Sequence, residues 1–202
     1  MEKIKILGIS GSLRQGSFNT SALRAIAGFV TASGKAAETA GAAGVEAEME
    51  IYVPSDIPPF NGDFEQDMPA PIRDFKAKIR AADALIFSSP EYNYSISGVM
   101  KNALDCASRP YGDNPFAAKP GAILGVSNGR FGTARAYYDL YKVVSGLNIF
   151  AMNYPQILIT NGGEKFDASG NLVDQETAEK LKAFTLALIE WTKKLKVAGL
   201  AK

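Results

Sequence analysis

Short apolar runs alternate with segments of helical periodicity along most of the chain, and no other feature restricts the fold as much. Apolar side chains that recur every three or four residues are typical of a helix packed on one face, whereas short, mainly apolar runs are typical of buried strands. The predicted strands cover residues 4–9, 48–53, 84–87, 122–126 and 156–160. The first predicted helix begins near Asn19, and the other predicted helices cover residues 72–82, 98–108, 133–146 and 174–195.

Successive strand–helix units predict an α/β fold with helices on both faces of a parallel sheet. Their number favours a flavodoxin-like arrangement, a five-stranded parallel sheet in the order 2-1-3-4-5. The second strand is more polar than the others, so we expect it at an edge. A chain of 202 residues has the size of one domain, and we expect a single domain over 1–202.

Two segments interrupt the alternation. Residues 31–44 are rich in alanine but contain Gly34, Gly41 and Gly44, so we expect the first helix to fray there into a flexible connection. Residues 54–71 contain several prolines, which predicts an extended surface loop before the second helix.

The composition excludes several classes of protein. The formal net charge of +1, with no long run of one sign, predicts no binding of nucleic acid or anionic membranes. No apolar stretch approaches the roughly 20 residues of a membrane helix, and no signal peptide is visible, so we expect a cytoplasmic protein. The chain has one cysteine, Cys106, and no histidine, which excludes Cys/His zinc sites and Ser-His or Cys-His catalytic pairs; we expect no metal site.

Serines follow three of the predicted strands: Ser10 and Ser12 after the first, Ser88 and Ser89 after the third, and Ser127 after the fourth. In a doubly wound sheet, ligands bind beyond the carboxyl ends of the strands, where the strand order reverses. The predicted order brings these three loops to one crevice.

The first loop resembles a phosphate site but not a nucleoside triphosphate site. Gly11 and Gly16 have P-loop spacing, yet Ser17 and Phe18 stand where a P-loop has Lys and Ser/Thr. What remains suits a terminal phosphate monoester: helix N–H groups and the side chains of Ser12, Arg14, Ser17, Asn19 and Thr20. The alternative is a capped strand-to-helix turn with a solvated arginine.

The second loop, residues 90–95, reads Pro-Glu-Tyr-Asn-Tyr-Ser. Aromatic rings beside an amide and a carboxylate offer a flat wall with polar groups, which suits a planar heterocycle. The alternative is a tyrosine-rich surface turn whose rings pack only locally.

Residues 9–19 (ISGSLRQGSFN), residues 89–105 (SPEYNYSISGVMKNALD) and the Ser-Arg pair at 108–109 together resemble the NAD(P)H-dependent FMN reductase family, which includes quinone and chromate reductases. Cys106 stands where the family commonly has Trp, and Ser97 where Pro is frequent. Both positions lie on the helix after the second loop, so they bear on packing and pocket shape more than on FMN binding. We expect Cys106 to be a buried small side chain without a chemical role.

The resemblance implies a flavodoxin-like fold that binds FMN tightly but noncovalently, takes electrons from NADPH or NADH, and passes two of them by a ping-pong mechanism to quinones, or to chromate, azo compounds or free flavin. It also implies a homodimer or homotetramer. Tyr94 and Arg130 are candidates for contact with the substrate. The candidate cofactor-binding residues are Ser10, Ser12, Arg14, Ser17, Asn19, Thr20, Pro90, Glu91, Tyr92, Asn93, Tyr94, Ser127, Gly129 and Arg130.

Two other functions are compatible with the same loops. A flavodoxin-type electron carrier would bind the same cofactor and pass single electrons to proteins, but such carriers are typically strongly acidic and this chain is not. A non-catalytic nucleotide-binding protein could also use the crevice.

Overall fold

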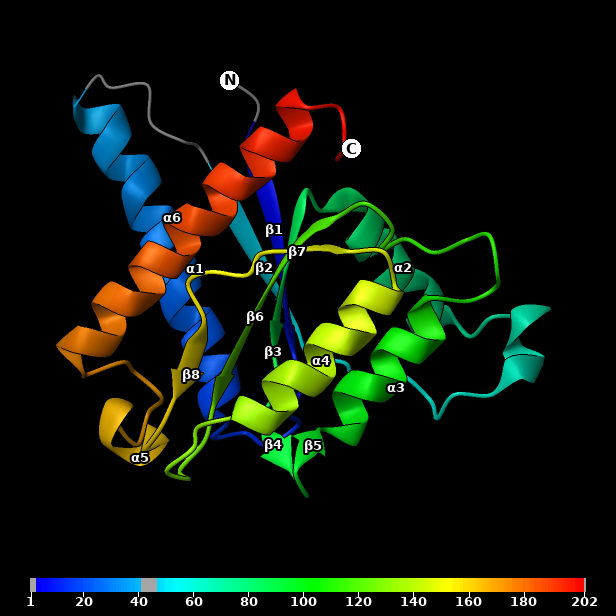
Figure 1. Cartoon of the computed structure of the whole chain (residues 1–202), viewed down its shortest axis with the longest axis horizontal. Helices are drawn as coiled ribbons and strands as arrows, with labels where there is room; N and C mark the ends of the chain where they lie inside the picture. The colour runs from blue at the N-terminus through cyan, green and yellow to red at the C-terminus, as the bar shows by residue number, and fades with distance from the viewer. Residues whose placement is uncertain (1–2, 41–46, 202) are drawn as a thin grey trace.

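A parallel β-sheet runs through the centre of the molecule, seen in a computed structural model that describes residues 3–40 and 47–201 (Figure 1). Its order is β2-β1-β3-β6-β7, and β8 also pairs with β6. The strands are β1 (Ile4–Ser10), β2 (Ala47–Tyr52), β3 (Ala84–Ser88), β6 (Pro120–Val126), β7 (Phe150–Ala151) and β8 (Ile157–Ile159). The predicted order 2-1-3-4-5 is confirmed, and the polar second strand lies at an edge as expected.

The last position of the sheet is filled in two pieces. β7 pairs with the start of β6, where Gly121 lies beside Ala151, and β8 pairs with its end, where Val126 lies beside Ile159. The prediction placed a single strand over 156–160, so it found β8 and missed β7. A run of two residues carries no period that a sequence can reveal.

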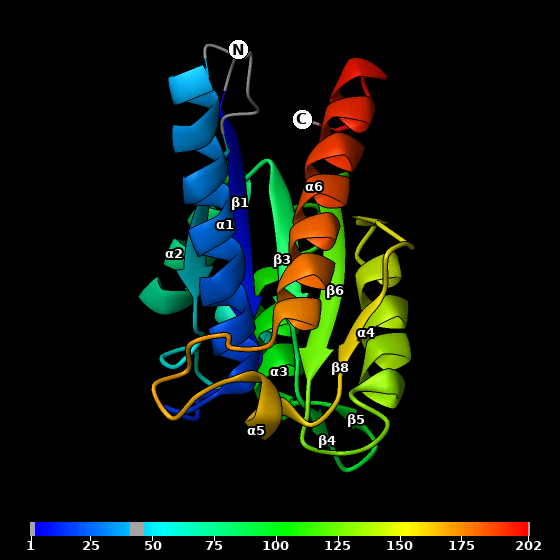
Figure 2. The same ribbon diagram turned by 90° about the vertical axis from the view of Figure 1, so that its left-hand side faces the viewer.

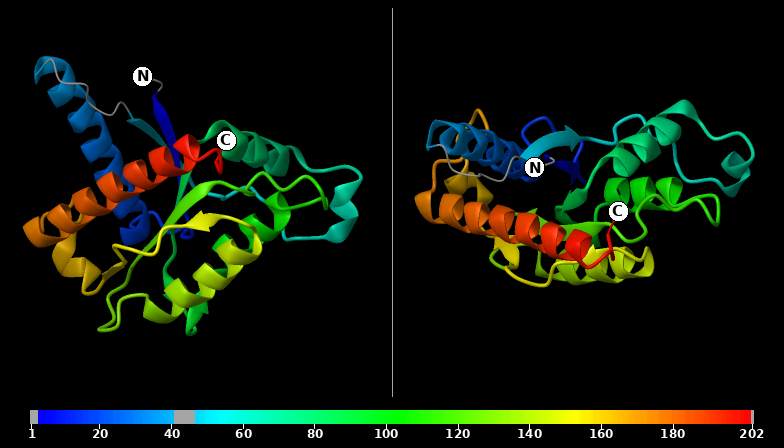
Figure 3. Two further views of the ribbon diagram at one scale, coloured as in Figure 1. Left: turned by 45° about the horizontal axis from the view of Figure 1, so that its top comes forward. Right: turned by 90° about the horizontal axis from the view of Figure 1, so that it is seen from above.

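Helices cover both faces of the sheet, as predicted. Helices α1 (Phe18–Ala40) and α6 (Gln175–Val197) pack on one face. Helices α2 (Ala70–Ala81), α3 (Gly98–Ala107) and α4 (Ala134–Gly146) pack on the other. In both views of Figure 3, α1 (blue) lies towards the left and α2 and α3 (green) lie towards the right, whereas α6 (orange to red) runs from the left to the middle of the molecule.

The alternation of side chains along the inner strands explains the two layers of core. In β1, Ile6 belongs to the cluster under α1 and α6, whereas Leu7 and Ile9 belong to the cluster under α2, α3 and α4. In β3, Ile86 and Phe87 divide in the same way. Because successive side chains of a strand point to opposite faces, a wholly apolar strand must be covered on both.

The predicted fraying of the first helix is wrong as far as the structure describes it. Helix α1 continues through Gly34 to Ala40, and the rest of the predicted break, residues 41–44, lies outside the described residues. The helix tolerates Gly34 because one glycine costs only about 1 kcal/mol and the alanines around it are the strongest helix formers.

Besides β7, four short elements were not predicted. A 3₁₀ turn, η1 (Gly62–Glu65), interrupts the proline-rich loop. Strands β4 (Glu91–Tyr92) and β5 (Ser95–Ile96) form a small antiparallel hairpin, and α5 (Gly162–Lys165) follows β8. The hairpin and α5 lie together at the bottom of the molecule, beyond the carboxyl ends of the strands (Figure 2). Among the described helices, none is both long enough and apolar enough to span a bilayer.

Candidate functional site

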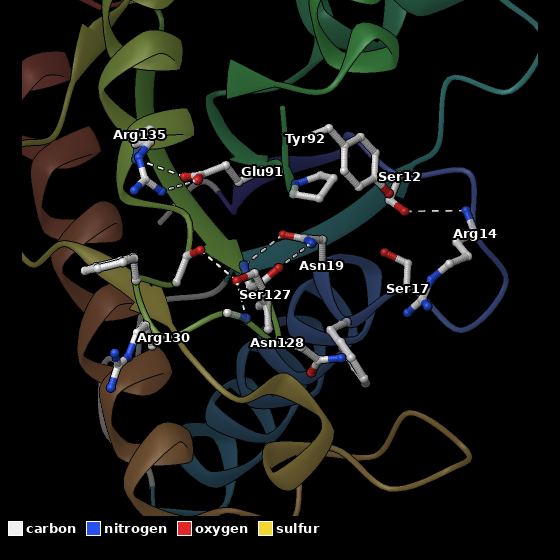
Figure 4. Close-up of a pocket in the computed structure, with 16 residues that line it drawn as sticks. Ser12, Arg14, Ser17, Asn19, Glu91, Tyr92, Ser127, Asn128, Arg130 and Arg135 are labelled. Atoms are coloured by element: carbon white, nitrogen blue, oxygen red, sulfur yellow. Dashed lines mark hydrogen bonds and ion pairs between the residues drawn. The ribbon is translucent and has the colours of Figure 1, made fainter. Parts of the chain in front are cut away.

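A cleft of about 510 Å³ opens at the carboxyl ends of β1, β3 and β6, where the predicted serine loops meet (Figure 4). A ligand site of this kind is typically a concavity of a few hundred Å³ with a few convergent polar groups. The predicted residues that line the cleft are Ser12, Arg14, Ser17, Asn19, Pro90, Glu91, Tyr92, Ser127, Gly129 and Arg130. Ser10, Thr20, Asn93 and Tyr94 do not line it.

The first wall is the turn that leads from β1 into α1. The Ser17 hydroxyl accepts a hydrogen bond from the Thr20 amide at 3.3 Å and so caps the helix. The amides of Phe18 and Asn19 have no hydrogen-bond acceptor within the described part of the chain. Free N–H groups at the positive end of a 23-residue helix make this wall a site for an anion.

Arg14 supplies a positive charge to the same wall. Its guanidinium donates to the Gly16 carbonyl at 2.7 Å and lies 5.5 Å from the centre of the Phe18 ring, while the residue itself is exposed. Figure 4 shows Ser12, Arg14 and Ser17 together on this side of the cleft. No carboxylate pairs with Arg14 among the described residues, so its charge is available to a ligand.

Ser10 and Thr20 lie beneath this wall rather than in it. Their hydroxyls are 2.8 Å apart, and both residues are buried. They join the end of β1 to the first turn of α1, so they support the wall and have no surface to offer a ligand.

The side chain of Asn19 is a clamp between α1 and the sheet. Its Nδ2 donates to the Val126 carbonyl at 3.0 Å, and its Oδ1 accepts from the Val126 amide at 3.0 Å. The Ser88 hydroxyl donates to the same Oδ1 at 3.1 Å. Because both amide groups are used in this way, Asn19 offers the cleft its backbone N–H, while its side chain fixes the distance between the walls.

Ser97 joins the start of α3 to the turn that follows β1. Its hydroxyl accepts from the Met100 amide at 3.1 Å as the N-cap of α3 and donates to the Gly11 carbonyl at 2.6 Å. A Cβ on Gly11 would approach this hydroxyl to 3.0 Å, so the glycine permits the close contact. Ser97 has a φ of −65°, which proline also adopts, and the serine adds a hydroxyl that a proline lacks.

Cys106 is buried on α3, as expected. Its Sγ lies 3.7 Å from the Pro58 carbonyl, and burial, followed by the nearby charge of Asp105, raises the pKa of the thiol to about 11. A thiol that stays protonated is a packing group, which agrees with the absence of a predicted chemical role.

The second wall is the β4–β5 hairpin. Asn93 and Tyr94 form its turn with φ of 49° and 70°, the left-handed conformations of a type I′ turn. The turn carries both residues out of the cleft, while Tyr92, before it, keeps its half-exposed ring in the lining. The wall is therefore aromatic, as predicted, but it presents one tyrosine instead of two.

Glu91 holds the hairpin against helix α4. Its Oε2 accepts from the Arg135 amide at 3.0 Å and from the Ala136 amide at 3.3 Å, and its Oε1 accepts from the Arg135 guanidinium at 2.8 Å. Thr133, the residue at the N-cap position, makes no capping bond. Glu91 therefore caps α4 from another element, and its charge is compensated.

The third wall is the turn between β6 and α4. The Ser127 hydroxyl donates to the Gly132 carbonyl at 2.7 Å and accepts from the Gly129 amide at 3.0 Å, so it closes the turn from within. Asn128 accepts from the Gly163 amide at 2.9 Å and ties the turn to α5. Arg130 is exposed at the rim and has neither an ion pair nor a hydrogen bond with the described residues.

The structure adds six lining residues that the predicted set lacked: Phe18, Val126, Asn128, Phe131, Gly132 and Arg135. Phe18 was noted only as a departure from the P-loop pattern. Arg135 lies in the first turn of the helix that follows the third serine loop, and this position was the one signal that could have identified it.

Comparison with known proteins agrees with this geometry. A family model described as NADPH-dependent FMN reductase matches residues 4–164. An NAD(P)H-dependent FMN reductase of Pseudomonas aeruginosa is 43% identical over 196 residues, which cover 96% of this chain and 98% of that protein. A 2-hydroxy-1,4-benzoquinone reductase of a Burkholderia species is 36% identical over 194 residues, or 96% of this chain and 99% of that protein. The solved structure of a flavoenzyme NAD(P)H:(acceptor) oxidoreductase from Paracoccus denitrificans superposes with a TM-score of 0.79 at 30% identity, covering 95% of this chain and 98% of that one.

Proposed function

The chain belongs to the NADPH-dependent FMN reductase family, and on this premise we propose that it transfers two electrons from NADPH or NADH through FMN to a quinone. One observation carries the proposal. A single cleft is lined both by an anion site, formed by the start of α1 and Arg14, and by the aromatic ring of Tyr92, which Figure 4 shows beside Ser12. FMN carries a phosphate that suits the anion site and a planar ring system that suits the aromatic side chain.

The donor set fits the phosphate. Ser12 and Ser17 provide hydroxyls, the first turn of α1 provides free N–H groups, and Arg14 provides an unpaired charge. Each charge-assisted hydrogen bond contributes about 1.5 to 3 kcal/mol, so three or four hold a phosphate firmly. No lysine stands where a triphosphate site would need one, which favours a monophosphate.

The rest of the lining fits the ring system. Tyr92 provides a flat wall, and Pro90 and Phe131 provide apolar surface at the other two loops. In the turn over 127–132, the amides of Asn128, Arg130 and Phe131 have no acceptor among the described residues, and these are the polar groups that would face the edge of the ring and stabilise negative charge on it.

FMN, when bound, supplies the redox chemistry, because it accepts a hydride from NAD(P)H and passes two electrons to the acceptor. The protein then needs to bind and orient its ligands and needs no side-chain base, which is consistent with a chain that has no histidine. Arg130, unpaired at the rim, would meet the phosphates of the nicotinamide donor. Quinones are the principal acceptors, and chromate, azo compounds and free flavin are further candidates.

We also propose a homodimer or homotetramer in the cytoplasm. Exposed aromatic residues outside the cleft, such as Tyr111, which is 85% exposed, are candidate contacts between subunits. A chain with a single cysteine has no need of an oxidising compartment.

Anaerobic titration with NADPH and then NADH tests the function. We expect each donor to bleach the visible absorbance of the purified FMN-loaded protein, and a quinone to restore it. Steady-state oxidation of NADPH with benzoquinone should then proceed. Protein that binds FMN but oxidises neither donor would favour a nucleotide-binding protein, and reduction only by a protein partner in single-electron steps would favour an electron carrier.

A further inference from the structure

Tyr94 occupies a backbone conformation that a bulky residue seldom adopts. It is the second central residue of a type I′ turn, where its φ of 70° favours glycine. Burial does not hold it there, since the side chain is 71% exposed. Strain of this kind persists where surrounding contacts impose it, and it occurs often at functional sites.

The contact that holds the ring is with Arg135. The guanidinium carbon lies 4.2 Å from the centre of the Tyr94 ring and 5.1 Å from the centre of the Phe131 ring. Phe131 and Arg135 both line the cleft, and Phe131 is 62% exposed. The two rings and the guanidinium thus form a continuous surface that leads from the cleft lining to the outside.

This surface carries little net charge. The Arg135 guanidinium is paired with the Glu91 carboxylate at 2.8 Å, and it contacts aromatic rings. The phosphates of a nicotinamide donor need an unpaired cation, which this surface does not offer because Arg135 is paired with Glu91. A fused-ring quinone that extends beyond the cleft presents an uncharged aromatic ring, which can stack on aromatic side chains.

We propose that Tyr94 and Phe131 form a platform for the outer rings of the acceptor and select quinones with two or more fused rings. This inference rests on the proposed quinone reduction and deepens it. A one-ring quinone is accommodated within the cleft and gains nothing from the platform, whereas a fused second ring reaches it. No bond is made or broken at the platform, so its contribution is binding energy for the extended acceptor.

The test compares naphthoquinone with benzoquinone in the FMN-loaded wild type and in Tyr94→Gly, by the ratio of their kcat/KM values. Because the ratio is compared between proteins, the different intrinsic reactivities of the two quinones cancel. Stacking of aromatic rings corresponds to about a two- to ten-fold effect, and we expect the ratio to fall by that factor in Tyr94→Gly. Phe131→Ala should shift the ratio in the same direction.

Glycine is chosen for position 94 so that a change in quinone selectivity cannot be attributed to a loss of stability. Glycine is favoured at this turn position, so the melting temperature of Tyr94→Gly should not fall below that of the wild type. Tyr94→Asn, which also tolerates the left-handed conformation, provides a second variant. Tyr138→Ala is the matched control, because it removes an exposed tyrosine from α4 that does not line the cleft, and it should leave the ratio unchanged.

An equal loss of kcat/KM for both quinones in Tyr94→Gly would overturn the platform. A different oligomeric state of Tyr94→Gly in sedimentation would also overturn it, because the Tyr94 ring would then belong to a subunit interface. A wild type that reduces neither quinone would overturn the proposed function itself, and this outcome is distinct from a wild type that reduces both and loses no selectivity in the variants.

Discussion

Glu91 and Arg135, 44 residues apart in the sequence, are joined by both the backbone and the side chain of the arginine: the carboxylate accepts from the Arg135 amide at 3.0 Å and from its guanidinium at 2.8 Å. Nearby, the Ser95 hydroxyl donates to Asp139 at 2.8 Å, so the hairpin is bonded to α4 at two levels. Two walls of the cleft therefore behave as one unit, and the position of the aromatic wall depends on a helix cap.

Glu91→Ala should lower the free energy of unfolding by about 1 to 3 kcal/mol, since the start of α4 loses its cap and Arg135 loses its partner. It should also weaken FMN binding, because the hairpin is released from α4. Urea unfolding and fluorescence titration with FMN measure the two effects. Glu179→Ala removes an exposed surface ion pair with Lys182 and should change neither; an Ala variant at Glu91 as stable as this control would refute the role of the cap.

Arg14→Ala should raise the dissociation constant of FMN about ten-fold or more, because one charge-assisted contact to the phosphate is lost. Its contacts within the protein are weak, so the melting temperature should remain that of the wild type. Equilibrium dialysis of FMN-depleted protein against FMN measures the affinity. Arg24→Ala, an exposed arginine on the same helix outside the cleft lining, is the control and should bind FMN normally. Equal affinities of the Arg14 and Arg24 variants would place the phosphate elsewhere.

Asp174 should make the stability of the protein sensitive to acid. Hydrogen bonds from Thr177, with a further contribution from Lys165, lower its pKa from 3.8 to about 2. A carboxyl whose pKa is lowered by folding stabilises the protein fully above its unfolded pKa, and this stabilisation disappears as the pH falls through the folded value. Asp174→Asn keeps an N-cap side chain but cannot ionise. The difference in unfolding free energy between the wild type and this variant should therefore shrink between pH 3.8 and about 2; a constant difference over that range would contradict the assignment.

Gly125→Ala should be strongly destabilising. A Cβ at this position would lie 1.9 Å from the Thr133 hydroxyl and 2.8 Å from the Ser89 carbonyl, and the backbone of the cleft would have to move. Overpacking of this severity costs at least about 2 kcal/mol. Gly28 is an exposed position of α1, where an added Cβ meets no atom within 4 Å, so Gly28→Ala should instead stabilise the protein by about 0.5 to 1 kcal/mol. Thermal unfolding of the pair provides the comparison, and similar melting temperatures would contradict it.

The fold was largely predictable because its signals are local. The apolar strands and helical periods revealed the units, and the rule for parallel sheets then placed Ser12, Ser17 and Ser127 at one crevice. The split of the last strand was missed because it depends on pairing with β6. The continuation of α1 past Gly34 was missed because the helix-breaking effect of glycine and the helix-forming effect of the alanines nearly cancel.

The roles of individual side chains were less predictable because their partners are distant in sequence. The type I′ turn at Asn93 and Tyr94 lacks the glycine that usually announces a hairpin, so nothing indicated that Tyr94 would point out of the cleft. Glu91 was expected to line the ring and ribityl side of the site; it does line the cleft, but its carboxylate is bonded to the start of α4. For Asn19, the amide that suited a phosphate bonds Val126, a partner 107 residues away.

At the end of β6, the Asn19 side chain bonds the backbone of Val126 as a neighbouring strand would. Its amide donates to the Val126 carbonyl and accepts from the Val126 N–H. A turn bonded to a sheet in this way does not come away by local fluctuation, because both groups would lose their partners at once. The opening of the crevice therefore keeps its width for as long as the sheet persists. The α1 wall of the cleft is therefore placed when the sheet forms, and a ligand meets a wall whose position was already set during folding.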